Sequence, residues 1–175
     1  MTWSIPMTAV AGSTFTAAQF NQYVRDNLNE TAPAKASAAN QWIVSAGSNA
    51  IVARTISSAL IAASESTTSN TFTDLTTPGP AVTATTGNTA LVTISSSVAN
   101  SSTGFGLIAV AVSGATTLAA SDTNSIGLYP GSGARVAGIL FLTGLTAGSN
   151  TFTLKYRQAT GTTTFLDRRI GVLPL

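Results

Sequence analysis

The residue types that most often carry catalysis are scarce in this chain of 175 residues, which has no histidine and no cysteine. Histidine is the commonest general acid or base and the base of a serine triad, so both kinds of chemistry lack their usual residue. Cysteine would supply a thiolate nucleophile, a disulfide or a metal ligand, and its absence leaves the redox compartment unreadable. What remains for acid–base or metal chemistry is a set of six carboxylates: Asp26, Glu30, Glu65, Asp74, Asp122 and Asp167.

These carboxylates follow no catalytic pattern. A glycosidase needs two that face each other, and spacing along the chain pairs neither Asp74 nor Asp122 with another acid. An oxygen-only cation site using Asp74 or Asp122 stays open as an alternative, although no Asp-x-Asp-type loop supports it. The glycine-rich stretch 131–135 lacks the Lys-Ser/Thr ending and following helix of a phosphate loop, and no Gly-x-Ser-x-Gly elbow is present. We therefore expect a protein that is not an enzyme, with no catalytic residue, no metal and no cofactor. A polymer-degrading enzyme using Asp74 or Asp122 is the least favoured alternative.

Charge is almost as scarce as catalytic residues. Only 8% of the residues are charged, against roughly 25% in an ordinary soluble domain. No Lys or Arg lies between Arg54 and Arg135, and 44% of the chain is apolar. Such a chain presents a poor water-facing surface as a lone domain. We expect its apolar surface to be hidden in an assembly; a monomer with a large core is the alternative.

The same composition argues against two kinds of partner. A net charge of +2 provides no clustered basic patch, so nucleic acid is not an expected partner. No stretch approaches the roughly 20 apolar residues of a membrane helix. The N-terminus also lacks the basic and apolar regions of a secretory signal. No membrane partner is therefore expected.

The elements that position any site begin with a helix near the N-terminus. Thr16 and Gln19 have the spacing of a capping box, and Phe15 and Phe20 that of a hydrophobic staple. Pro33 is expected to end the helix after about four turns.

One apolar stripe runs along this predicted helix. Phe20, Val24 and Leu28 recur every four residues. A helix of this length barely forms alone in water. The stripe must therefore pack, either on the chain's own domain or on a neighbouring subunit.

After residue 66 the pattern changes to short runs rich in Thr, Val, Ile, Leu and Phe, which is typical of strands. In one of them Phe152, Leu154 and Tyr156 fall on the same face. The runs 107–112 and 139–142 are apolar on both faces, which indicates central strands or a subunit interface. Strands are predicted at 70–75, 81–86, 90–98, 105–113, 125–129, 134–142, 151–158 and 164–173, with turns at 78–80, 87–88, 100–104, 130–133 and 147–150.

About eight strands without intervening helices predict an all-β fold. We expect an eight-stranded, jelly-roll-like β-sandwich over residues 67–175, preceded by a short N-terminal helix and an extended arm. The helix belongs to a segment at 1–33, and residues 34–66 form an Ala-, Ser- and Asn-rich arm or linker with short strand or turn pieces.

The late part of the chain holds the candidate surface residues of the sandwich. The loops near 100–103, 122–124 and 160–162 are candidate outer contacts, and the aromatic residues placed for a sugar site are Tyr129 and Phe165. The basic residues Lys155, Arg157, Arg168 and Arg169 are interpreted as a solvated strand face or as ion pairs with Asp167.

An ordered series of short motifs at the N-terminus carries a resemblance. The motifs are Trp3-Ser4-Ile5-Pro6, Ala11-Gly12, Thr16-Ala17, Asn21 and Val24-Arg25-Asp26-Asn27-Leu28. The series resembles the opening segment of many small virion proteins of tailed bacteriophages, especially those that infect actinobacteria. The stretch 45–54 is similar to the short segment that follows it in phage tail and fibre proteins. The rest of the chain resembles the jelly-roll heads of phage fibres and capsid decorations in its strand pattern alone.

The resemblance implies a non-enzymatic structural protein on the exterior of the virion, either a capsid decoration or head fibre or a minor tail or fibre protein. Such proteins are commonly trimers, so the implied partners are further copies of the chain and the major capsid or tail proteins. The implied particle-docking residues are Trp3, Pro6, Phe15, Phe20, Val24, Arg25, Asp26 and Leu28. The apolar ones would anchor the segment, and Arg25 and Asp26 would set its polar register. The alternative is a fibre head that binds a host-surface glycan.

Overall fold

The structure is a computed structural model that describes residues 3–128 and 133–175. The chain forms two compact units that meet in sequence between Thr55 and Ile56. We call them the N-terminal unit and the β unit and describe each by itself. Strands in several antiparallel sheets dominate, with a short helical stretch, so the predicted all-β class is confirmed.

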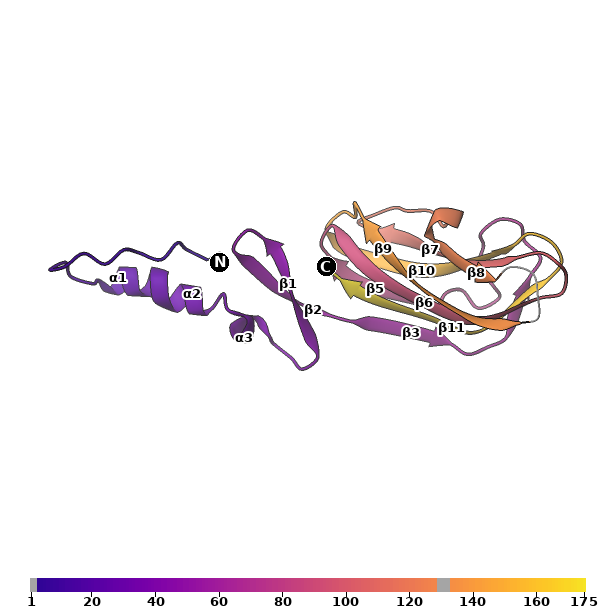
Figure 1. Cartoon of the computed structure of the whole chain (residues 1–175), viewed down its shortest axis with the longest axis horizontal. Helices are drawn as coiled ribbons and strands as arrows, with labels where there is room; N and C mark the ends of the chain where they lie inside the picture. The colour runs from indigo at the N-terminus through magenta and orange to yellow at the C-terminus, as the bar shows by residue number, and fades with distance from the viewer. Residues whose placement is uncertain (1–2, 129–132) are drawn as a thin grey trace. The chain divides into compact units, whose positions relative to one another are not determined.

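The helix of the N-terminal unit begins at the predicted capping box. The Thr16 hydroxyl accepts a 3.2 Å hydrogen bond from the backbone N–H of Gln19, whose side-chain oxygen accepts one of 2.9 Å from the Thr16 N–H. Phe15 and Phe20 meet edge to face, with ring centroids 6.1 Å apart, as a staple requires. The helical run comprises α1 (Ala17–Phe20), the π-helical turn η1 (Asn21–Arg25) and α2 (Asp26–Leu28) (Figure 1).

The prediction that Pro33 ends this helix is wrong, because the helix ends at Leu28. The Thr31 hydroxyl donates a 2.7 Å hydrogen bond to the Leu28 carbonyl, which satisfies that carbonyl outside the helical ladder. Pro33 lies instead in the first turn of α3 (Ala32–Lys35), where its missing N–H costs no helical hydrogen bond.

An extended segment at the N-terminus lies along the helix and is held there by Asn27. The buried Asn27 amide donates to the carbonyls of Ser4 (3.0 Å) and Tyr23 (3.1 Å) and accepts from the Ser4 N–H (2.8 Å). A turn at 11–12, where Gly12 has a φ of 79°, leads the chain from this segment towards the helix. Asn27 thus joins two parts of the chain that are 23 residues apart.

The stretch predicted as an extended arm contains a hairpin. β1 (Gln41–Gly47) pairs antiparallel with β2 (Ala50–Thr55), and Asn49 supplies the left-handed conformation of the turn with a φ of 55°. Yet no residue of the N-terminal unit belongs to the buried hydrophobic core of the described chain, which runs from Leu75 to Val172. A two-stranded hairpin without such a core is marginally stable in water.

The β unit consists of two antiparallel sheets (Figure 1). Their strand orders are β5-β10-β7-β8 and β3-β11-β6-β9, and β4 pairs with β11 beyond the end of β3. β3 and β4 come from the stretch predicted as a linker. The strands are β3 (Ser57–Ile61), β4 (Glu65–Thr67), β5 (Ala81–Thr86), β6 (Thr89–Asn100), β7 (Gly106–Gly114), β8 (Ser125–Leu128), β9 (Ala134–Thr143), β10 (Gly148–Gln158) and β11 (Thr163–Pro174); a short 3₁₀ turn, η2 (Asp122–Asn124), precedes β8.

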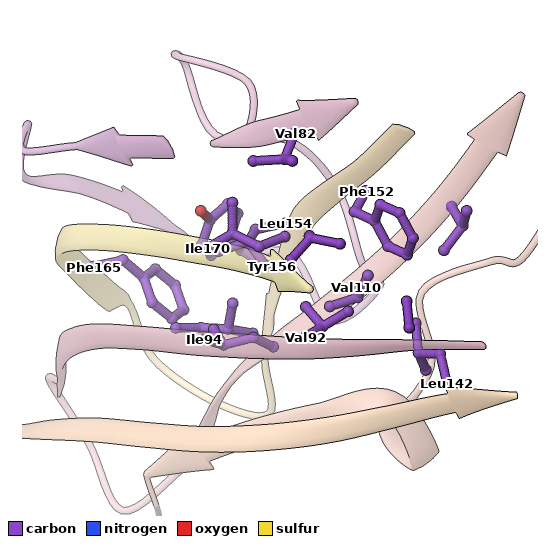
Figure 2. Close-up of a cluster of buried hydrophobic side chains, with 14 of the residues drawn as sticks. Val82, Val92, Ile94, Val110, Leu142, Phe152, Leu154, Tyr156, Phe165 and Ile170 are labelled. Carbon is purple, nitrogen blue, oxygen red and sulfur yellow. The ribbon is translucent and has the colours of Figure 1, made fainter. Parts of the chain in front are cut away.

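A single hydrophobic core fills the space between the two sheets (Figure 2). Phe152, Leu154 and Tyr156 of β10 are fully buried, which confirms the alternation expected for this strand. Side chains of the other sheet, such as Ile94 and Ile170, meet them across the core. The β unit is therefore a two-layered sandwich with its own complete core.

Some predicted strands and turns differ from the structure. Residues 70–75 form one isolated bridge, Thr73 to Tyr156, because the Ser69 hydroxyl binds the Thr71 carbonyl in a local turn that replaces a ladder. β10 begins at Gly148, inside a predicted turn. The predicted turn at 130–133 lies, except for its last residue, outside the described residues.

The two runs that are apolar on both faces have different outcomes. Residues 107–112 lie in β7, which is flanked by β10 and β8 and almost wholly buried, as expected of a central strand. Residues 139–142 lie in β9, an edge strand on which Ile139 and Phe141 are exposed. A central position is therefore wrong for the second run.

A bulge in β11 changes which of its residues face the core. Leu166 pairs with Ser97 and Arg169 with Ser95, so two residues on β11 stand opposite one on β6. Asp167 adopts a φ of 52°, a left-handed conformation that Asp tolerates better than most residues. Within the bulge, Arg168 faces inward and is fully buried.

Candidate docking and association surfaces

Each carboxylate side chain of the molecule lies beside a basic one, at N–O distances from 2.6 to 3.6 Å. The six pairs are Arg25–Asp26, Lys35–Glu30, Arg135–Asp167, Lys155–Asp74, Arg157–Asp122 and Arg168–Glu65. The acids considered for hydrolysis are both engaged: Asp74 binds Lys155 at 2.6 Å, and Asp122 binds the Nε and Nη2 of Arg157 at 2.9 and 2.6 Å. Charge–charge contacts thus occupy the residues that the sequence offers for acid–base chemistry.

Neither a metal cluster nor a membrane-spanning helix is found in the described ranges 3–128 and 133–175. Within them no group of three or more His, Cys, Asp and Glu side chains is placed to hold a metal ion. No helix in this part of the chain has the length and apolar character needed to cross a membrane.

The Arg168–Glu65 pair is the buried one. Arg168 was predicted to lie on a solvated face or beside Asp167; both are wrong, because the bulge turns Arg168 inward and Asp167 pairs with Arg135. The Arg168 Nη2 lies 3.1 Å from Glu65 Oε2, and its Nη1 donates a 3.3 Å hydrogen bond to the Thr77 carbonyl. The guanidinium also lies 5.4 Å from the Tyr156 ring centroid. No periodicity signals a bulge at Asp167, so the sequence could not reveal this pair.

Hydrogen bonds shift the pKa of the carboxyl group beside this arginine, and burial shifts the pKa of the phenol. The side-chain and backbone donors of Thr77 hold the pKa of Glu65 below its ordinary value of 4.5, and Arg168 lowers it further. Burial raises the pKa of Tyr156, whose hydroxyl donates a 2.7 Å hydrogen bond to the Gly79 carbonyl. Together, Glu65, Arg168 and Tyr156 connect the segment between β4 and β5 to β10 and β11. This cluster offers neither an exposed acid nor a nucleophile.

The predicted docking residues lie within the N-terminal unit, and most of them are exposed. The exposed fractions are 39% for Trp3, 52% for Phe15, 48% for Phe20 and 61% for Leu28. Pro6 is exposed as well, and Val24 is half-buried. Arg25 and Asp26 bind each other, with 2.7 Å between Nη2 and Oδ1, so this polar pair is already satisfied within the chain.

The helix buries a different face from its predicted apolar stripe. Tyr23, Asn27 and Glu30 lie on the covered side, with Asn27 hydrogen-bonded to Ser4 and Glu30 bound to Lys35 at 2.9 Å. This ion pair is also the main reason that the pKa of Glu30 is lowered. Phe20 and Leu28, at the two ends of the stripe, are exposed. The helix is thus held through polar contacts, while its apolar stripe is left accessible.

Part of the outer face of the β5-β10-β7-β8 sheet is covered by its own chain, while the outward residue Thr83 on the edge strand β5 is exposed. The Arg157 guanidinium lies between the rings of Phe72 and Phe105, 5.3 and 5.0 Å from their centroids, and carries the bidentate bond to Asp122. Leu107, which pairs with Arg157 across the ladder, is 6% exposed.

The outer face of the β3-β11-β6-β9 sheet is different, because large apolar side chains lie open on it. The ladder places Leu173, Leu91 and Phe141 in one row, Gly171, Thr93 and Ile139 in the next, and Leu60, Arg169, Ser95 and Ala137 in a third. Ile139 is 67% exposed, Phe141 62% and Leu60 47%. We call this set of three rows the apolar face.

Two of the three candidate contact loops meet at one end of the β unit. The Asn100 side chain donates to the Thr160 carbonyl at 3.1 Å, and the Ser101 N–H donates to the Thr162 carbonyl at 3.0 Å. The third loop is η2, which the buried Asn124 ties to the Val110 carbonyl at 2.6 Å. Phe165, considered for a sugar site, is fully buried against Tyr156, so that assignment is wrong. Tyr129 lies outside the described residues.

The sequence matches no family model, and no curated protein matches it.

Proposed function

We propose that this chain is a non-enzymatic structural protein of a tailed-bacteriophage virion. Its N-terminal unit docks on the particle, and its β unit is displayed on the exterior as a trimer. The observation that carries the proposal is the contrast between the two units. The β unit has a complete core, whereas the N-terminal unit, over its described residues, fully buries no hydrophobic side chain and exposes large ones: Trp3, Ile5, Val10, Phe15, Phe20, Leu28 and Trp42.

A unit of this kind is completed by a partner. Ordering one residue costs roughly 1–2 kcal/mol of backbone entropy, which globular units recover largely through apolar burial. Fully burying a large apolar side chain yields roughly 1.5–3 kcal/mol. Closing the exposed halves of Phe20 and Leu28 against another protein therefore adds about 2 kcal/mol, and the other exposed apolar residues extend this contact. The major capsid or tail proteins are the partners that the N-terminal resemblance implies.

The arrangement of the β unit suits display. The chain enters it at Ile56, just before the residues of β3 that pair with Val172 near the end of β11. The loops 100–103 and 160–162 lie where β11 begins, at the opposite end of the same strand. An arm attached at one end and loops at the other fit a head that stands on a docked segment, either as a capsid decoration or head fibre or as a minor tail or fibre protein.

We further propose that the sandwich is a jelly roll. Its strand pairs are nested: β3 and β4 with β11, β5 with β10, β6 with β9 and β7 with β8. If β3 and β4 are counted as one interrupted edge strand, the unit has eight strands. The first of them pairs with the last, the second with the seventh, the third with the sixth and the fourth with the fifth. Folding such a nested ribbon into two sheets gives the jelly-roll order.

The docking role is tested by removing the exposed ends of the helical stripe. Phe20→Ser with Leu28→Ser should leave the β unit folded, because neither side chain belongs to the buried core. It removes the Phe15–Phe20 contact at the start of the helix and should strongly reduce the copies of the chain on purified particles of the encoding phage. Asn21→Ser with Gln22→Ser, on the exposed polar surface of the same helix, is the matched control and should incorporate normally. Quantitative mass spectrometry of particles measures both. Equal copy numbers for the two variants would overturn the docking assignment.

A further inference from the structure

We propose that the apolar face of the β3-β11-β6-β9 sheet is the surface through which copies of this chain associate with one another. The inference rests on the proposed function for its trimeric state and adds the residues that form the interface. Its centre is the edge strand β9, with Ile139 and Phe141, and its far side is Leu60 of β3.

The sandwich itself distinguishes this face from the other one. A stacked arginine and ion pairs cover the outer face of the β5-β10-β7-β8 sheet along β10, and the exposed outward residues of its edge strand β5 are small: Ala81, Thr83 and Thr85. On the apolar face the outward positions carry Leu, Ile and Phe among small residues, and these large side chains stay open to solvent. Gly171 has no side chain to project from this face, and a Cβ added there would stand 2.6 Å from the Thr93 hydroxyl oxygen. The face is therefore flat at β11 and β6, between Leu60 on β3 and the large residues of β9.

Three large apolar side chains contribute exposed area to this face. Leu60, Ile139 and Phe141 alone expose the equivalent of nearly two large side chains, on the order of 350 Å² if one presents roughly 200 Å². That area lies at the lower end of the roughly 300–600 Å² of the largest apolar patch on a typical monomer, and Arg169 and Ser95 separate Leu60 from β9 within it. Leu91, Leu173 and the small residues of the three rows bring the face towards the roughly 800 Å² per partner of a stable interface.

Edge geometry and charge favour a second copy as the occupant. β9 ends its sheet with ten residues, and an apolar edge strand of that length is a template for association with like chains. Arg169 lies in the third row of the apolar face. Within the described residues it forms no ion pair, and neither does Arg54. Asp167, two residues before Arg169, is 41% exposed and lies 3.6 Å from Arg135. A second copy therefore brings both an apolar face and a carboxylate for Arg169.

The first test measures the mass of the full chain in solution. Sedimentation velocity over a range of concentrations should show the wild type at a multiple of its 17.6 kDa monomer mass. Ile139→Ser with Phe141→Ser should weaken association about a hundredfold or more, as expected for large side chains central to an interface. Phe20→Ser with Leu28→Ser removes a similar apolar pair elsewhere and should remain oligomeric. Because both residue pairs are exposed, circular dichroism should show all three chains folded.

The second test uses the absence of cysteine from the chain. Ile139→Cys should react with maleimide at least tenfold more slowly at concentrations where the chain is oligomeric than where it is monomeric. Thr83→Cys, at an exposed position of β5, should react at the same rate under both conditions.

The outcomes separate this inference from the docking role. The interface is overturned by a wild-type chain that stays monomeric. It is also overturned by an oligomer that survives Ile139→Ser with Phe141→Ser and leaves the thiol of the Ile139→Cys variant fully reactive. Neither result affects the particle-incorporation test of Phe20 and Leu28, whose failure would overturn docking alone.

Discussion

Replacing Tyr156 by phenylalanine removes one oxygen atom from the interior of the β unit and tests how that interior is held together. Tyr156 is fully buried, and its hydroxyl donates a 2.7 Å hydrogen bond to the Gly79 carbonyl. The ring, which the variant keeps, lies 4.9 Å from the Phe165 ring and beneath the Arg168 guanidinium. Tyr156→Phe therefore removes the hydrogen bond and preserves the packing.

The expected magnitude follows from that single bond. Losing a net intramolecular hydrogen bond costs about 1 kcal/mol, and leaving the buried Gly79 carbonyl without its partner adds about as much. The free energy of unfolding of the β unit should fall by about 2 kcal/mol. If the urea dependence is about 2 kcal/mol per molar, the unfolding midpoint should fall by about 1 M.

Far-UV circular dichroism in urea, dominated by the sheets, measures this change. The control is Tyr23→Phe in the N-terminal unit, where the structure shows no hydrogen bond to the hydroxyl among the described residues; its midpoint should match the wild type. Because burial raises the pKa of Tyr156, the wild type should also lose stability as the pH rises above the ordinary pKa of 10.0, and Tyr156→Phe should lack this loss. An unchanged midpoint for Tyr156→Phe would refute the reasoning.

Acid should destabilise the β unit through Glu65. The pKa of Glu65 is lower in the folded chain than its ordinary 4.5. The stabilisation from this carboxylate is therefore complete above pH 4.5 and is lost as the pH falls through the folded pKa. Urea titrations at several pH values should show this loss of unfolding free energy in the wild type and not in Glu65→Gln. A fragment from Ile56 to Leu175 keeps all residues of the buried core, so its urea midpoint should equal that of the full chain, and a fall of about 1 M or more would contradict this. Asn27→Ala removes both hydrogen bonds to Ser4, so segment 3–10 should be cleaved on the order of tenfold faster in limited proteolysis, with the β-unit midpoint unchanged.

Local patterns predicted the parts of the fold that depend on neighbouring residues. The Thr16–Gln19 capping box and the Phe15–Phe20 staple each join residues close together in the chain, and both form. The period-2 pattern of β10 likewise identified its buried face, because successive side chains of a strand point to opposite faces of the sheet.

Features that depend on distant partners escaped the sequence. β3 and β4 are short, and β4 carries no apolar residue. They become strands because β11, which follows much later in the chain, offers them a free edge. Arg168 looked solvent-facing because a strand without a bulge would place it there. Phe20 and Leu28 are exposed and not packed on the chain's own domain, which was one of the two alternatives for the stripe. The helix is held instead by Asn27, whose role depends on Ser4 and not on any helical period.

The distribution of indole groups in the molecule has an optical consequence. Both tryptophans of the chain, Trp3 and Trp42, lie in the N-terminal unit, where they are 39% and 54% exposed. The β unit, which holds the entire hydrophobic core of the described chain, has none. Intrinsic tryptophan emission therefore reports on the N-terminal unit alone, free of signal from the sandwich. Burial of these rings against a partner would shift that emission to the blue, so attachment can be followed in an unlabelled wild-type chain.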